Sequence, residues 1–176
     1  MKRTLVDVNV LLDAVLERAP HAEVATKIWT AVETRQVTGL VPGHGVTTLF
    51  YLFSRARGAD SARRAVAHLL SVFGVAAVGQ ATLQRALTLG WTDFEDAVCA
   101  AAAEAAGCDF IVTRDPARFA ASPVQTVDPA TALALLERKG GAGRLSERRG
   151  APYVKGPRTP SGRSRRKRPR RAIVNA

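Results

Sequence analysis

The sequence predicts an α/β fold in which helices cover both faces of a mostly parallel sheet. Short apolar runs alternate along the chain with longer segments whose apolar residues recur at helical spacing. Strands that alternate with helices are joined by right-handed crossovers, which leave neighbouring strands parallel. With 176 residues, 47% of them hydrophobic, the chain is long enough for one domain with a packed core.

The apolar runs predict strands at residues 3–6, 39–42, 75–78, 109–113 and 124–127. Helical spacing predicts helices at residues 8–18, 20–32, 47–58, 60–73, 81–89, 92–106 and 128–137. Pro20 is expected in the first turn of its helix, where a missing N–H costs nothing. Thr92 stands three residues before Glu95, which predicts a capping box at the start of the Ala-rich helix.

The pattern stops at residue 138, and we predict one folded domain at 1–138 followed by a disordered basic tail at 139–176. The tail holds 13 of the 26 Lys and Arg residues and one acid, so its net charge is +12, whereas the rest carries −1. With little to bury, such a segment cannot offset its ordering entropy. Its basic block, which includes Arg165, Arg166, Lys167 and Arg168, either contacts RNA through phosphates or is a solvated extension.

The two cysteines, Cys99 and Cys108, form no C-x-x-C pair, which argues against a disulfide framework or a thiolate zinc site. No apolar run reaches the 18 or more residues of a membrane span, and Asp7 and Asp13 interrupt any signal-peptide core. We therefore expect a cytoplasmic protein without a membrane partner.

Acidic residues stand at the ends of predicted strands and at one helix start. Asp7 follows the first strand, Asp115 follows the fourth, and Asp93, Glu95 and Asp96 open the Ala-rich helix. Ligands in parallel α/β folds lie at the carboxyl ends of the strands, so these acids are candidates for one cleft. Carboxylates held together favour a hard cation such as Mg²⁺ or Mn²⁺, which can hold a phosphate and activate water.

The residues resemble the PIN-domain ribonucleases, a family that includes VapC-type toxins. The matching pieces are Leu5 to Asp13, Asp93 to Ala97 and Asp109 to Asp115, in this order, across about residues 1–137. The resemblance implies a three-layer α/β/α PIN-like fold, a Mg²⁺- or Mn²⁺-dependent endoribonuclease, a homodimer and, for a toxin, a small antitoxin protein as partner.

Carried over, the resemblance makes Asp7, Asp96 and Asp115 the catalytic metal ligands, with Asp93 nearby. The family's second acid, a Glu early in the helix after the second strand, has no counterpart, since residues 43–51 contain no acid. Thr47 or Thr48 stands there, and a hydroxyl brings no charge.

Several neighbouring residues have two readings. Asn9 either orients the Asp7 carboxylate through its side chain or belongs to the helix start, and Thr113 either bonds a ligand beside Asp115 or is structural. Arg114 either contacts RNA or is a solvated charge, and Asp13 is either solvated, paired with Arg18 or part of the site. Asp93 either binds metal or complements the helix dipole, which is the preferred role for Glu95. His44 is read as polar surface in a loop between two glycines.

The leading hypothesis is therefore a metal-dependent endoribonuclease acting as a toxin. One alternative is a catalytically weakened PIN-like module that binds RNA but lacks the second acid. A phosphoacceptor receiver domain is disfavoured, because it needs a late Lys and residues 28–138 contain none.

Overall fold

The structure, a computed structural model, describes residues 1–144. The strands are β1 (Arg3–Val6), β2 (Thr38–Pro42), β3 (Gly74–Ala76), β4 (Phe110–Val112) and β5 (Thr126–Val127). The helices are α1 (Val8–Val15), α2 (Ala22–Glu33), α3 (Gly43–Arg57), α4 (Ala59–Val72), α5 (Gln80–Leu89), α6 (Phe94–Ala105) and α7 (Pro129–Arg144), with a 3-10 turn η1 (Pro116–Phe119).

The five strands form one parallel sheet in the order β3-β2-β1-β4-β5. Along the chain, β2 is added beside β1 and β3 beside β2; β4 is then added on the opposite side of β1. The strand order therefore reverses between β1 and β4, and the carboxyl ends of these two strands flank the crevice where parallel α/β folds bind ligands.

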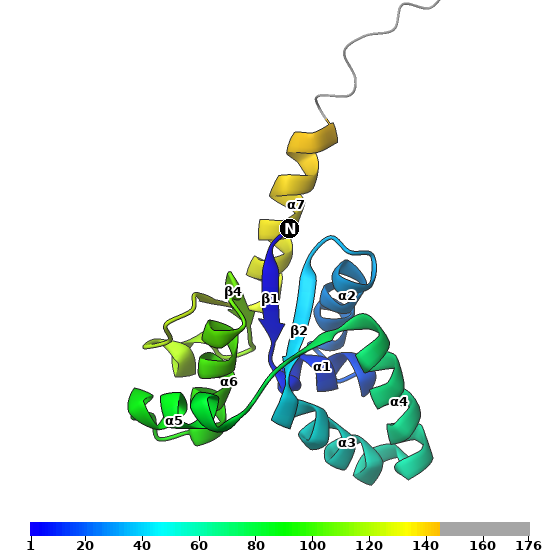
Figure 1. Ribbon diagram of the computed structural model, residues 1–176. Coiled ribbons are helices and arrows are strands. Elements are labelled where there is room, and N and C mark those ends of the chain that lie inside the picture. The colour runs from blue at the N-terminus through cyan, green and yellow to red at the C-terminus, as the bar shows by residue number, and fades with distance from the viewer. Residues whose placement is uncertain (145–176) are drawn as a thin grey trace, which may run out of the picture.

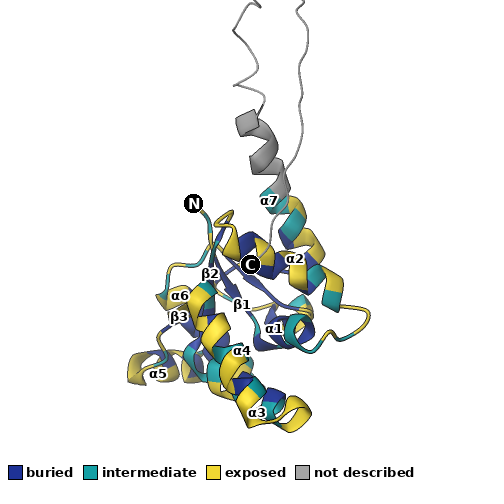
Figure 2. Cartoon of the chain, turned by 90° about the vertical axis from the view of Figure 1, so that its right-hand side faces the viewer, coloured by how far each residue is buried: buried dark blue, intermediate teal, exposed yellow. Residues whose placement is uncertain are grey.

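Alternating side chains of the sheet divide the core in two. Val6 and Val112 point into the larger core, formed with α1, α2, α3, α4 and α7, whereas Leu5 and Ile111 point into the smaller core beside α6. Figure 1 shows α5 and α6 on one side of the strands and α1 to α4 on the other, and Figure 2 shows β1 and β2 as buried strands between helices. The predicted three-layer α/β/α architecture is confirmed.

The small residues of α6 have a packing reason. Every residue from Ala97 to Ala103 is buried, and the helix lies against β2, β3, β4 and η1 while α5 covers it from outside. Small side chains let these elements approach closely, which holds the first turn of α6 against the sheet edge near Asp7.

Four local predictions are wrong. The first helix ends at Val15, because Glu17 adopts a left-handed backbone conformation (φ 53°). Helix α2 begins at Ala22, so Pro20 lies in the preceding turn. Helix α3 begins at Gly43, which places His44 in its first turn rather than in a loop. The N-cap of α6 is Asp93, not Thr92, since the Asp93 carboxylate accepts hydrogen bonds from the backbone of Glu95 and Asp96.

The last helix, α7, continues past the predicted domain boundary at 138 to Arg144. The rest of the predicted basic tail, with Arg165, Arg166, Lys167 and Arg168, lies outside the described residues. Within residues 1–144, no helix combines the length and the apolar character that crossing a membrane requires.

Candidate metal centre

Asp7 lies where β1 gives way to α1. Its backbone N–H donates to Val112 O of β4 (2.9 Å), and its carboxylate caps α1 by accepting from Asn9 N (3.4 Å). The Thr113 hydroxyl donates to the second carboxylate oxygen, Oδ2 (2.9 Å). The Asp7 carboxylate is therefore held by the first turn of α1 and by Thr113, the residue after β4, at the switch point of the sheet.

Asp96 lies in the first turn of α6, beside the capping residue Asp93. Its side chain is only 16% exposed, and its buried Oδ2 has no hydrogen-bond partner. A buried carboxylate oxygen without a hydrogen bond is costly, so this position favours a positively charged ligand.

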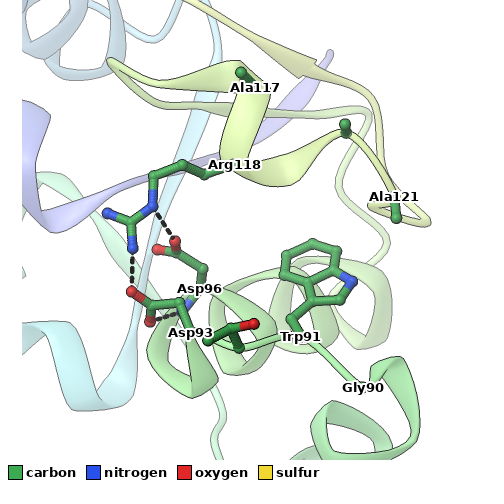
Figure 3. A pocket seen from close by; sticks show the side chains of 9 residues that line it. Gly90, Trp91, Asp93, Asp96, Ala117, Arg118 and Ala121 are labelled. Carbon is green, nitrogen blue, oxygen red and sulfur yellow. Dashed lines mark hydrogen bonds and ion pairs between the residues drawn. The ribbon is translucent and has the colours of Figure 1, made fainter.

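Arg118, in η1, supplies a positive charge to two of the three acids at the α6 start, Asp93 and Asp96. Its Nε lies 3.0 Å from Asp96 Oδ2 as an ion pair without hydrogen-bond geometry, and its Nη2 pairs with Asp93 Oδ2. Figure 3 shows the guanidinium between the two carboxylates. Sequence reasoning missed Arg118, because nothing in the sequence around η1 indicates that it folds back over α6.

Two small adjoining cavities bring the predicted acids together. One, of about 150 Å³, is lined in part by Asp7, Asp93, Asp96, Asn9 and Thr48. The other, of about 140 Å³, is lined in part by Asp7, Asp96, Asp115, Thr113 and Arg114. Asp7 and Asp96, far apart in sequence, face both cavities, so the predicted site residues among 1–144 surround one place at the end of β1 and β4.

Both acids have raised pKa values, and burial is the largest cause for each. Burial raises the pKa of Asp7, against the lowering effect of the Thr113 and Asn9 hydrogen bonds. Burial and the charge of Asp93 raise the pKa of Asp96 to about 6, with a smaller contribution from Asp7 and an opposing effect of Arg118. A cation between Asp7 and Asp96 would lower both pKa values.

The supporting residues have more specific roles than the sequence indicated. Asn9 meets Asp7 through its backbone N–H, not through its side chain. Thr113 joins two site acids, since its hydroxyl donates to Asp7 and accepts from Asp115 N (3.3 Å). Thr48 faces the cavity at the place of the missing acid, whereas the Thr47 hydroxyl is exposed and bonds to the His44 carbonyl within α3. The Asp115 side chain itself is exposed and makes no capping hydrogen bond.

Asp13 is not solvated, contrary to one reading of the sequence. It is fully buried in α1 and pairs with Arg114 (3.3 Å) and, more distantly, with Arg18 (4.0 Å). Arg114 lines the site but is engaged with this buried carboxylate, so it is not the freely solvated charge that the sequence also allowed. The pair links α1 to the segment between β4 and η1.

His44 is partly buried and lies across the cavity from the start of α6. Its Nε2 lies 3.8 Å from Glu95 Oε1, and its buried Nδ1 has no hydrogen-bond partner. Burial lowers the pKa of His44, against the raising effect of Glu95 and Asp7. A neutral imidazole therefore stands at the edge of the acidic site.

The donors present fit a hard divalent cation in their chemistry. Asp7 and Asp96 present carboxylate oxygens to the same cavity, and Asp96 Oδ2 makes no hydrogen bond but forms an ion pair with Arg118, so a cation there would compete with that guanidinium. Among residues 1–144, no three acidic, histidine or cysteine side chains gather closely enough to make a complete metal cage. Mg²⁺ tolerates this arrangement, because it keeps several waters and is usually held by one or two carboxylates together with substrate phosphates.

Comparison with known proteins gives a family for this arrangement. A family model described as a PIN domain matches residues 3–117 of the 176, a range that contains Asp7, Asp96 and Asp115. No curated protein is significantly similar in sequence.

Solved structures share the fold at low identity. DNA-bound VapBC from Salmonella typhimurium matches with a TM-score of 0.59 at 14% identity, covering 73% of this chain and 99% of that chain. VapC20 from Mycobacterium tuberculosis, described as a sarcin-ricin loop cleaving toxin, matches with a TM-score of 0.56 at 18% identity, covering 67% and 94%. A toxin-antitoxin complex from Klebsiella pneumoniae matches with a TM-score of 0.56 at 20% identity, covering 72% and 97%.

Proposed function

The chain belongs to the PIN domain family, and from this premise we propose that it is a metal-dependent endoribonuclease that hydrolyses RNA phosphodiester bonds. The observation that carries the proposal is the placement of Asp7, after β1, and Asp96, at the start of α6, around one cavity, where burial raises the pKa of each carboxyl group. Such a pair, at the carboxyl end of a parallel sheet, is what a site for a cation and a phosphate requires.

The chain's own residues have distinct tasks in this proposal. Asp7 and Asp96 would hold a Mg²⁺ or Mn²⁺ ion, with Asp115 at the mouth of the same cavity. The ion would supply positive charge for the scissile phosphate and activate water for attack. Thr113 and the Asn9 amide keep the Asp7 carboxylate in one orientation, and Arg118 neutralises part of the charge of the α6 acids.

One observation favours the alternative of a weakened, RNA-binding PIN module. No acid stands at the place of Thr48, and residues 1–144 contain no complete group of three metal-binding side chains. In that case the chain would bind RNA equally with and without metal and would not cut it.

Cleavage of a structured RNA by the full chain distinguishes the nuclease from the RNA-binding module. The parent is compared with Asp7→Asn and Asp96→Asn in Mn²⁺, Mg²⁺ and EDTA, and Asp60→Asn, whose exposed carboxylate lies on α4, is the matched control. Metal-dependent cutting by the parent and the control, lost in both site variants, supports the nuclease. Intact RNA binding without cutting under any condition supports the binding module.

We further propose that the protein acts as a toxin held by a small antitoxin. The support is the fold shared with VapBC assemblies from Salmonella typhimurium and other organisms. Expression of the chain alone is expected to arrest growth, and co-expression with the product of a short neighbouring gene to relieve it. Growth arrest that persists in Asp96→Asn would contradict a role for the nuclease in toxicity.

A homodimer is the proposed assembly of the chain itself. Leu83 and Leu87 of α5 and Phe94 of α6 are exposed by 39%, 67% and 45%, and large exposed apolar side chains typically mark protein contacts. Light scattering of the full chain is expected to give twice the chain mass, and Leu87→Lys to shift it toward the monomer. A monomeric parent would refute the assembly.

A further inference from the structure

A larger cavity adjoins the acidic site. It measures about 560 Å³ and lies between the end of α5, the start of α6 and η1, as Figure 3 shows. Its lining comprises Gly90, Trp91, Thr92, Asp93, Asp96, Ala117, Arg118, Ala120 and Ala121. Because Asp96 and Arg118 also line the acidic cavities, an occupant of this space would lie directly beside the candidate metal centre.

One wall of the cavity is a fixed aromatic surface. The Trp91 indole stands at a right angle to the buried Phe119 ring, with 5.7 Å between the ring centroids, and part of it remains accessible. In Figure 3 the indole points into the space below the segment that carries Ala117 and Ala121. The three alanines of this segment are exposed and small, so they leave the space in front of the indole open.

The charges of the lining select against an anionic occupant. Asp93 and Asp96 contribute carboxylates, and the single guanidinium of Arg118 is already paired with both. A phosphate would meet uncompensated negative charge, whereas a neutral planar group would meet an aromatic face and a guanidinium edge. The volume lies within the range of about 300–1,000 Å³ that is typical of small-ligand sites.

We propose that this cavity binds one unpaired nucleobase of the RNA substrate, stacked on Trp91, next to the phosphate that is cut. The inference rests on the proposed nuclease function and extends it to the form of the substrate. Proteins that recognise single-stranded RNA splay a base out and stack it on an aromatic side chain or an arginine plane. The enzyme therefore acts on a loop or bulge, where one base is free to leave the stack.

Tryptophan fluorescence reports this site directly. The chain has two tryptophans, and the other, Trp29, is 8% exposed among the residues of the larger core, beside Phe73. A Trp29→Phe variant of the full chain leaves Trp91 as the reporter. The probe is a ten-nucleotide single-stranded RNA, added in EDTA and again with Ca²⁺, and a ribose-phosphate oligomer without bases is the control.

Saturable quenching by the RNA, and none by the oligomer without bases, is the expected result. Binding by the Trp91 variants, which lack the reporter, is followed by the anisotropy of the same RNA carrying a fluorescein label. Base stacking is worth about 1–3 kcal/mol by truncation, so Trp91→Leu should weaken binding about five- to 160-fold, and Trp91→Phe much less. Ala121→Leu fills the cavity from an exposed position and should also weaken binding, which keeps the test valid if Trp91→Leu folds poorly.

Three outcomes would overturn the inference. These are no quenching in either condition, equal quenching by the oligomer without bases, and quenching by an aromatic peptide but not by RNA, which would assign the cavity to a protein partner. If the full chain still cuts RNA in Mn²⁺, such a result removes the base site and leaves the nuclease intact. Quenching by RNA without any cutting would instead refute the nuclease and retain base binding.

Discussion

Replacing Asp96 by asparagine is predicted to stabilise the fold at neutral pH. Burial, together with the charge of Asp93, raises the pKa of Asp96 from its ordinary 3.8 to about 6. A carboxyl group whose pKa is higher in the folded than in the unfolded chain holds its proton more tightly when folded. Its contribution to stability is therefore complete below about pH 4 and is lost as the pH rises through about 6.

The magnitude follows from the same values. The difference between 3.8 and about 6 corresponds to about 3 kcal/mol, an upper limit because the side chain keeps some contact with water. Arg118 lowers the pKa of Asp96, and the value of about 6 already includes this effect. For a domain of this size about 2–4 °C accompany each kcal/mol, so Asp96→Asn should raise Tm at pH 8 by at most about 6–12 °C.

The assay is thermal and urea unfolding of the full chain in EDTA between pH 4.5 and pH 8. The advantage of Asp96→Asn should shrink steadily toward pH 4.5, and Asp60→Asn, an exposed acid on α4, should stay within about 0.5 kcal/mol of the parent. Adding Mn²⁺ should stabilise the parent and not Asp96→Asn. If Asp96→Asn is no more stable than the parent at pH 8, the ionised Asp96 carboxylate does not destabilise the fold and the prediction fails.

Three further changes test the neighbouring contacts. Thr113→Val removes the hydroxyl that donates to Asp7 and should lower the free energy of unfolding by about 1–3 kcal/mol at pH 8. Urea unfolding measures the loss, and Thr113→Ser, which keeps the hydroxyl, is the control. Equal stability of the valine and serine variants would refute this role of the hydroxyl. Thr48→Glu adds a carboxylate to the cavity of Asp7, so it should lower stability in EDTA and tighten Mn²⁺ binding in calorimetry; an unchanged affinity would place Thr48 outside the site. Arg118→Gln should cost at most about 1 kcal/mol in EDTA, because its partly exposed ion pairs are weak, and the loss should disappear in saturating Mn²⁺; a loss that persists there would show that metal and Arg118 do not serve the same carboxylates.

The fold and the acid pair follow from local patterns. The run Arg3–Val6 matches β1, and period-two alternation within β1 and β4 explains why the sheet carries one core on each face. In a parallel sheet all strands end at the same edge, and β1 and β4 are neighbours there, so their carboxyl ends lie side by side. The positions of Asp7 and Thr113 were therefore predictable, as was the opening of α6 on Asp96.

The rest depended on contacts between distant segments. Arg118 reaches Asp93 and Asp96 because η1 folds over the start of α6, and no periodicity in the sequence encodes that approach. The sequence left Asp13 open as solvated, paired with Arg18 or part of the site; the structure pairs it with Arg18 and also with Arg114, about a hundred residues later, which local patterns do not reveal. Local rules also misjudged the cap of α6, since Thr92 and Asp93 are both good caps and the backbone geometry selects Asp93.

If Asp7 and Asp96 together hold a divalent cation, as we propose, direct titration of Mn²⁺ will detect its binding. Electron paramagnetic resonance of Mn²⁺ added to the full chain at pH 7.5 separates bound from free ion without requiring activity. We expect saturable Mn²⁺ binding by the parent and by Asp60→Asn, with an affinity at least about tenfold weaker in both Asp7→Asn and Asp96→Asn. A parent that does not bind Mn²⁺, or site variants that bind Mn²⁺ as tightly as the parent, would contradict a cation site formed by Asp7 and Asp96.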